Sequence, residues 1–209
     1  MVALTADEEG GDNNGIAWLI ANYPPFKTAE FAINEGGGGQ AKDGKKVLNG
    51  VQLSEKVYQS FNLEIKDPGG HSSLPRKDNP IYHLAKALTN LAEYDFPINL
   101  NDGTRAFFER SSKIETGQLA ADMKVIIQTP PDAGAVQRLS ASPYYNALLR
   151  TTCVATMLDA GHAENALPQT ATAVVNCRML PGEDPEKIKA QLISVFDDNR
   201  ITVTPIAPA

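Results

Sequence analysis

The sequence predicts a mixed α/β (α+β) protein whose larger part is a four-stranded antiparallel sheet with two helices on one face. From Val57 onward, the segments follow one another as strand, helix, irregular insertion, strand, strand, helix and strand. This is the order of the ferredoxin-like split βαβ arrangement. The first 40 residues alternate strand, helix and strand, which is typical of α/β domains. We therefore expect two parts, residues 1–56 and residues 57–209.

The first part is divided by its glycines and prolines. Residues 1–6 are expected to be the end of a buried strand, and a helix is expected over 15–22 because Pro24 and Pro25 cannot continue it. A short strand should cover 29–39, where it ends in four glycines, and another should cover 47–54 after a polar turn.

The second part shows clearer patterns. Residues 57–65 alternate apolar and polar side chains, as a half-buried strand does. Asn79 can cap a helix that has Pro80 in its first turn and runs to about Tyr94. Residues 96–148 lack alternation and contain amphipathic fragments, which predicts a helical insertion. Two strands rich in β-branched residues are expected at 151–158 and 170–180. A helix with an acidic first turn is expected at 181–198, followed by a last strand at 201–207.

Composition excludes several classes of protein. The chain has 209 residues, a net charge of −6, 42% hydrophobic and 21% charged residues, values that are ordinary for a globular domain. It has no strongly basic stretch, which argues against a nucleic-acid partner. No apolar run approaches the roughly 18 residues of a membrane helix, and the N-terminus lacks the pattern of a signal peptide. Localisation stays open.

The two cysteines, Cys153 and Cys177, each lie in an apolar, strand-like run. Neither has the spacing of a metal site. We expect two buried thiols, with a disulfide as the alternative if strand pairing brings the two residues into bonding geometry.

Three glutamates lie where an α/β domain would bind a ligand. Glu8 and Glu9 follow directly after a predicted buried strand, and Glu35 precedes glycines at the end of another. The carboxyl ends of such strands are where α/β sheets place their sites. Side chains of adjacent residues diverge, so one carboxylate can hold a metal while the other reaches a water bound to it. An acidic turn is more often a solvated loop, and both interpretations stay open.

Three polar residues in the second part are candidates for a site. His71 lies in a glycine-rich strand-to-helix junction, where a surface-loop histidine is the simpler interpretation. Arg178 lies in an otherwise apolar strand and needs a partner, because an unpaired buried charge is costly. The partner is either a structural carboxylate or a carboxylate of the substrate. Asn165 precedes that strand as an amide donor or a turn residue.

Four strings in the sequence together resemble a known family: LTADEEGG, AINEGGGG, GGHSSLP and AENALPQTATAVVNCRMLPGEDP. The family is that of the co-catalytic zinc metallopeptidases and amidohydrolases, which includes carboxypeptidase S, glutamate carboxypeptidase, aminoacylase and succinyl-diaminopimelate desuccinylase (peptidase family M20). The resemblance covers nearly the whole chain except the insertion. Its most specific strings are GHSSLP and NALPQTATAVVNCR. The insertion and the NALP string are most similar to the carboxypeptidase S and N-acyl-amino-acid amidohydrolase branch.

The resemblance implies a lid or dimerisation domain in residues 57–209 and part of a catalytic domain in residues 1–56. His71 resembles the lid histidine that reaches across a dimer and donates to the scissile carbonyl oxygen. Asn165 and Arg178 resemble the pair that binds the free carboxylate of a peptide or N-acyl amino acid. A homodimer formed through a lid edge strand and the adjacent helix is also implied. The alternative function is a non-catalytic module for dimerisation and substrate positioning.

The resemblance also implies a metal centre with two zinc ions. Glu9 and Glu35 resemble zinc ligands, and Glu8 resembles the general base that takes a proton from the metal-bound water. The family also uses a histidine in an HxD motif, a bridging aspartate and a further histidine, but His71, His83 and His162 lack that spacing. Two carboxylates are fewer than the ligands of a zinc site. We therefore expect the 209 residues to be an excised or proteolytic part of a longer enzyme, inactive alone and without retained zinc.

Overall fold

The computed structural model describes residues 1–7, 13–33 and 37–207. These divide into two compact units, one formed by Met1–Gln52 with the last residues of the chain and the other by Leu53–Ile206. Each unit is described by itself below.

Two short helices lie in the first unit. Helix α1 is Gly15–Asn22, as predicted, and the side-chain oxygen of Asn14 caps it by accepting the N–H of Ala17 at 3.0 Å. Helix α2, Pro24–Lys27, follows after Tyr23, so the prolines that end α1 also begin a further turn of helix.

The strands of the first unit differ from the predicted ones. Strands β1 (Gly39–Lys42) and β2 (Lys45–Asn49) form an antiparallel hairpin. Strand β2 overlaps the first residues of the strand expected over 47–54, whereas β1 begins only at Gly39, the last residue of the strand expected over 29–39. The strand expected over 1–6 is wrong: none of the described strands pairs with this segment, and its Val2 and Leu4 are exposed. An apolar run becomes a strand only where a neighbouring strand satisfies its N–H and C=O groups.

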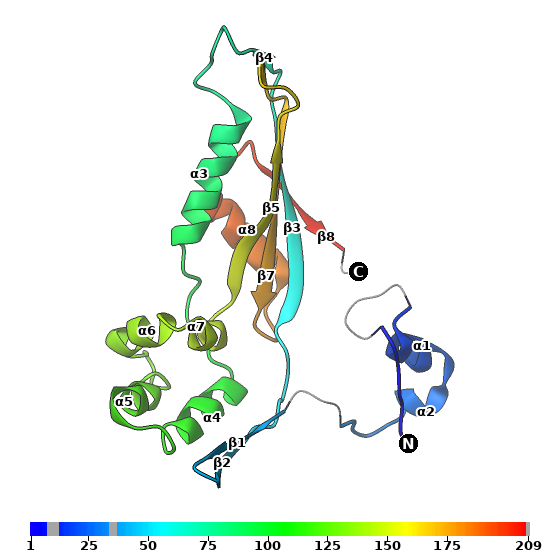
Figure 1. Ribbon diagram of the computed structural model, residues 1–209, viewed down its shortest axis with the longest axis vertical. Helices are drawn as coiled ribbons and strands as arrows, with labels where there is room; N and C mark the ends of the chain where they lie inside the picture. Colours follow the sequence, from blue (N-terminus) through cyan, green and yellow to red (C-terminus); the bar gives the residue numbers. More distant parts are fainter. Residues whose placement is uncertain (8–12, 34–36, 208–209) are drawn as a thin grey trace. The chain divides into compact units, whose positions relative to one another are not determined.

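The second unit contains the predicted four-stranded antiparallel sheet (Figure 1). Its strands follow the spatial order β5-β7-β3-β8 and are β3 (Val57–Lys66), β5 (Thr152–Ala160), β7 (Thr170–Met179) and β8 (Thr202–Ile206). The central strands β3 and β7 pair along their whole length, from Val57 opposite Met179 to Lys66 opposite Thr170. The outer strands β5 and β8 are the two edges of this sheet.

Helices α3 (Pro80–Glu93) and α8 (Pro185–Phe196) lie on one face of the sheet (Figure 1). Asn79 caps α3 by accepting the N–H of Ile81 at 2.9 Å, which confirms the predicted start of this helix. Helix α8 begins at Pro185 and not at residue 181 as predicted, and Asp184 caps it by accepting the N–H of Glu186 at 2.9 Å. None of the helices in the described ranges is both long and apolar enough to cross a membrane.

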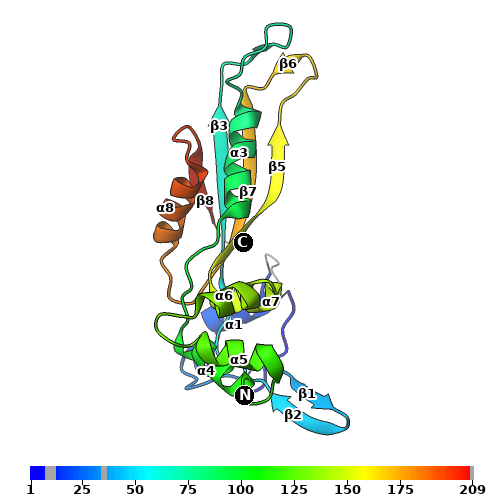
Figure 2. The same cartoon turned by 90° about the vertical axis from the view of Figure 1, so that its left-hand side faces the viewer.

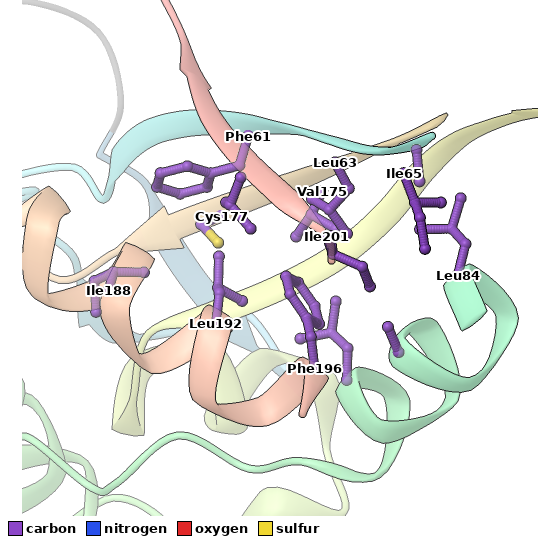
Figure 3. Packing of buried hydrophobic residues seen from close by; sticks show 14 of the residues in the cluster. Phe61, Leu63, Ile65, Leu84, Val175, Cys177, Ile188, Leu192, Phe196 and Ile201 are labelled. Carbon is purple, nitrogen blue, oxygen red and sulfur yellow. The ribbon is translucent and has the colours of Figure 1, made fainter. Parts of the chain in front are cut away.

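The main core lies between this sheet face and the two helices (Figure 3). Alternate residues of β3 and β7 point toward the helices, and the intervening residues point to the opposite face. The fully buried side chains that Figure 3 labels include Phe61, Leu63, Val175, Cys177, Leu84, Leu192 and Phe196.

The predicted insertion is helical and has a core of its own (Figure 2). Its helices are α4 (Asp102–Ser111), α5 (Gly117–Val125), α6 (Ala133–Ser140) and α7 (Pro143–Leu149). Asp122, which is almost fully buried, accepts three hydrogen bonds from Arg138 (2.7, 2.9 and 3.1 Å) and joins α5 to α6. Hydrogen bonds from Arg138 hold the pKa of the Asp122 carboxyl below its usual value.

The two cysteines form a disulfide, which corrects the expectation of two free thiols. Cys153 of β5 lies directly opposite Cys177 of β7, with the two Cα atoms 4.1 Å apart. The apolar runs around the two cysteines predicted that both lie in strands. Only the register between the two strands makes the cysteines neighbours.

Candidate functional site

A small two-stranded sheet lies at the end of the second unit that is farthest from the helical insertion (Figure 1). We call this end the tip; it consists of β4 (Gly70–His71), β6 (Ala166–Leu167) and the loops that they carry. His71 lies opposite Ala166 in this sheet, and the N–H of Ser72 donates to the carbonyl oxygen of Asn165 at 3.0 Å. Two predicted site residues that are distant in sequence therefore meet at the tip.

The ring of His71 is held by its own turn. The N–H of Leu74 donates to the carbonyl oxygen of His71 at 3.0 Å, which closes a four-residue turn. Inside this turn, Nδ1 of His71 accepts the backbone N–H of Ser73 at 3.2 Å and lies 2.8 Å from the Ser73 hydroxyl. The imidazole is otherwise exposed, as is the side chain of Asn165, so both are available to a ligand or a partner chain.

A buried carboxylate supports the loop that carries His71. Asp67, whose side chain is 9% exposed, accepts the N–H of Gly69 at 2.8 Å and forms an ion pair with Arg76. Arg76 also donates to the carbonyl oxygen of Gly69 at 3.3 Å. Gly69 has a φ of 75°, and a Cβ there would lie 2.7 Å from the side chain of Gln169. Glycine is therefore required at this position for both backbone conformation and space.

Arg178 lies near the opposite end of β7, on the sheet face that points away from α3 and α8. Its guanidinium carbon lies 4.8 Å from the centroid of the Tyr58 ring, and the two residues are cross-strand neighbours. Arg178 is exposed and forms no ion pair with any carboxylate in the described part of the chain. The structural carboxylate that the sequence allowed as its partner is not found among those residues.

One chain does not bring Asn165 and Arg178 together. Asn165 belongs to the tip, whereas Arg178 lies eight residues along β7 from Thr170. At about 3.4 Å per residue, this part of the strand alone spans roughly 27 Å. The two residues can act on the same carboxylate only if they come from different chains.

A second cation, Lys56, lies close to Arg178. Its ammonium donates to the carbonyl oxygens of Ala147 (3.0 Å) and Arg150 (2.8 Å) and to the hydroxyl of Thr152 (3.1 Å). These contacts fasten the end of the insertion to the beginning of the sheet. Burial lowers the pKa of Lys56 to about 8; the charge of Glu183 opposes this shift and that of Arg178 adds to it.

A family model described as the peptidase dimerisation domain of M20 peptidases matches residues 53–201. The chain belongs to the M20 peptidase family. The matched range contains strands β3, β5 and β7, both helices of the main core, the insertion and the tip, and it ends just before β8.

Curated M20 relatives agree with this result. The chain is 30% identical over 222 residues to probable carboxypeptidase S-like 2 of Dictyostelium discoideum, a match that covers 98% of this chain and 40% of the relative. It is 28% identical over 159 residues to the N-fatty-acyl-amino acid synthase/hydrolase PM20D1 of Homo sapiens, covering 75% of this chain and 31% of the relative. The chain thus spans well under half of the length of these relatives.

Solved structures give a weaker likeness. The M20 family metallo-carboxypeptidase Sso-CP2 from Sulfolobus solfataricus matches with 18% identity and a TM-score of 0.40, over 73% of this chain and 39% of that chain. An aminobenzoyl-glutamate utilization protein from Klebsiella pneumoniae matches with 11% identity and a TM-score of 0.41, over 74% and 28%.

The resemblance to M20 enzymes assigned three glutamates to the metal centre. These residues, Glu8, Glu9 and Glu35, lie outside the described residues. Within the described ranges, no group of three or more histidine, cysteine or acidic residues is arranged to hold a metal ion. His83 lies between Asp78 and Asp198, with its Nε2 2.9 Å from Asp78, and it also contacts Arg200. These contacts join the start of α3 to the segment before β8.

Sequence reasoning missed two residues of this M20 lid. The ring of Tyr58 supports the guanidinium of Arg178 across the two strands. The alternation of polar and apolar residues in each strand shows that both side chains point away from the core, but it does not show that the two residues are cross-strand neighbours. Ser73 was part of the quoted string GGHSSLP, but its contact with the ring of His71 depends on the turn between them. A serine two positions after a turn-forming polar residue is the pattern that could have indicated it.

Proposed function

We propose that this chain is the lid and dimerisation domain, residues 57–209, with part of the catalytic domain, residues 1–56, of a metal-dependent hydrolase. The enzyme would cleave an amide bond next to a free carboxylate, in a peptide or an N-acyl amino acid. The names of the carboxypeptidase S-like and N-fatty-acyl-amino acid synthase/hydrolase relatives support this substrate class.

The proposal rests on the position and contacts of the Arg178 guanidinium. Its guanidinium is exposed, rests on the Tyr58 ring and has no carboxylate partner in the described part of the chain. A guanidinium offers two parallel N–H donors that match the two oxygens of a carboxylate. The face of Tyr58 restricts how the guanidinium turns, which prepares it for an incoming carboxylate.

A homodimer would complete this site. Strand β5 is an open sheet edge with exposed Val154, Met157 and Leu158, and the neighbouring helix α3 exposes Tyr82. An apolar edge of this kind is suited to pairing with its own copy about a two-fold axis. Antiparallel pairing of two β5 strands sets the tip of one chain at the end of the sheet where its partner carries Arg178. Asn165 and His71 of one chain would then face the substrate carboxylate bound by the other.

Each candidate residue has a role in this proposal. At the tip, His71 donates a hydrogen bond to the scissile carbonyl oxygen, and Asn165 donates its amide to the substrate carboxylate. In the first unit, Glu8 is the general base, and Glu9 and Glu35 contribute ligands to the metal centre, for which we propose zinc.

The ligands of this chain do not by themselves complete the metal centre. Two carboxylates are fewer than the three or four protein ligands of a zinc site. The three histidines of the chain all lie in the second unit, where His71 and His83 are engaged in other contacts. We therefore derive no step through the metal, and we propose that the isolated chain is inactive.

The test is a double cycle in the enzyme that contains this chain, combining Arg178→Lys with a substrate whose carboxylate is amidated. Lysine keeps the charge but loses the paired donors, so the variant should lose about 30- to 1000-fold in kcat/KM on the free acid. Amidation should cost the wild type a similar factor and the variant little more. Arg110→Lys, on the exposed face of α4, is the matched control and should behave as wild type.

Additive losses in this cycle would reject the proposed carboxylate contact. Absence of hydrolysis by the wild-type enzyme, with retained binding of the free acid, would favour the non-catalytic positioning module instead.

A further inference from the structure

The hydrogen bonds of His71 determine which of its ring nitrogens carries the proton. The backbone N–H of Ser73 points at Nδ1 from 3.2 Å. A backbone N–H can only donate, so Nδ1 must be the acceptor in this contact. A neutral imidazole has one ring proton, and that proton must therefore be on Nε2.

The hydroxyl of Ser73 acts in the same direction. It lies 2.8 Å from the same Nδ1, and because it can rotate, it donates to a nitrogen that has no proton. If Nδ1 carried the proton instead, the ring N–H would face the N–H of Ser73, and that amide would lose its acceptor. The turn closed by His71 and Leu74 keeps the three groups in this arrangement.

We propose that Ser73 is a positioning residue that holds His71 in the tautomer with the proton on Nε2. This tautomer leaves an N–H donor on the side of the ring that faces away from the turn. The inference rests on the proposed function, in which that donor meets the scissile carbonyl oxygen of a substrate bound with the partner chain. The other tautomer would present a lone pair to the oxygen where negative charge develops, and would repel it.

The tautomer can be read in the full 209-residue chain by long-range proton–nitrogen correlation spectra of labelled histidine. A His71→Gln variant identifies the signals of this ring among those of the three histidines. Where the ring is neutral, the wild type should show a protonated Nε2 and an unprotonated Nδ1. Ser73→Ala should admit a measurable fraction of the other tautomer, and Ser73→Thr should restore the wild-type spectrum.

The matched control is Ser72→Ala. Ser72 contributes its backbone amide to the tip, and alanine keeps that amide, so the spectrum should not change. A wild-type ring protonated on Nδ1, or a Ser73→Ala spectrum identical to wild type, would overturn the proposal.

Kinetics separate this inference from the proposed function. In the enzyme that contains this chain, Ser73→Ala should lower kcat in proportion to the Nε2-protonated fraction that is lost, with little change in KM, so that about half of the rings in the other tautomer would give about a 2-fold loss. Ser72→Ala and Ser73→Thr should retain the wild-type kcat. A tautomer change without loss of kcat would support the positioning role and reject His71 as the donor. Loss of kcat without a tautomer change would reject the positioning role.

Discussion

At the scale of single residues, Lys56 is a cation in a half-buried position, where removal from water makes its charged form less stable. Its ammonium is half-buried between the sheet and the end of α7, and all three of its N–H groups have oxygen acceptors. Burial nevertheless dominates and lowers its pKa from 10.5 to about 8. The charged form of Lys56 is therefore less stable in the folded protein than in the unfolded chain.

This shift predicts how stability depends on pH. Between about pH 8 and 10.5 the unfolded chain keeps the Lys56 proton that the folded protein has lost, so the contribution of this residue to stability should rise with pH. From about pH 7 to pH 10, the wild type should gain on the order of 1–2 kcal/mol relative to Lys56→Met, after allowance for partial exposure. Urea unfolding at both pH values measures this difference.

The exposed Lys187→Met on α8 is the control for Lys56, and it should show no such change with pH. A wild-type advantage over Lys56→Met that stays constant or shrinks as pH rises would contradict the expected sign.

Contacts between residues that are close in sequence could be predicted, whereas contacts between residues of different strands could not. Asn79 and Pro80 are adjacent in sequence, and their capping of α3 needs no distant partner. The disulfide and the Tyr58–Arg178 contact depend on which residues of neighbouring strands are opposite, and a shift of one residue would change both.

At the scale of elements, the sequence predicted what forms within the second unit better than what forms in the first. Strands β3, β5 and β7 are nine or ten residues long, and helices α3 and α8 combine helical spacing with clear caps, so only the five-residue β8 is a short element of this core. Residues 1–6 carry only apolar character, which cannot specify a strand without a partner strand. The insertion was predicted as helical, but its division into α4–α7 was not.

Strand β5 is the element on which dimerisation should depend. Met157→Lys places a charge on this exposed apolar edge, and a two-fold axis brings the two introduced charges into the same interface. Such like-charge contacts cost several kcal/mol, so the dimer should weaken by about 100-fold or more. Sedimentation equilibrium at tens of micromolar should find a dimer for the wild type and a monomer for the variant.

The opposite edge of the same sheet supplies the control for this experiment. Thr204→Lys introduces the same charge at an exposed position of β8 and should leave the dimer intact. A monomeric Thr204→Lys together with a dimeric Met157→Lys would assign the interface to β8 instead.

At the scale of the whole molecule, the proposed function makes the second unit a spacer between two halves of a binding site. The tip carries His71 and Asn165, and the opposite end of the sheet carries Arg178 on the face that the helices leave open. A rigid sheet with a buried core cannot fold these ends together, because the pairing of β3 with β7 keeps both strands extended. The separation is a consequence of the fold, and under the proposed function it would make activity depend on assembly.

Mixing two inactive variants of the enzyme that contains this chain tests that dependence. His71→Ala damages every tip, and Arg178→Ala damages every carboxylate site, so each homodimer should be inactive. In a mixed dimer, the intact tip of the Arg178→Ala chain meets the intact Arg178 of the His71→Ala chain, which restores one site of two. Random exchange makes about half of the dimers mixed, so activity should recover to about a quarter of the wild-type value. If both residues served the site of their own chain, every site in the mixture would keep one defect, and mixing after subunit exchange would restore nothing.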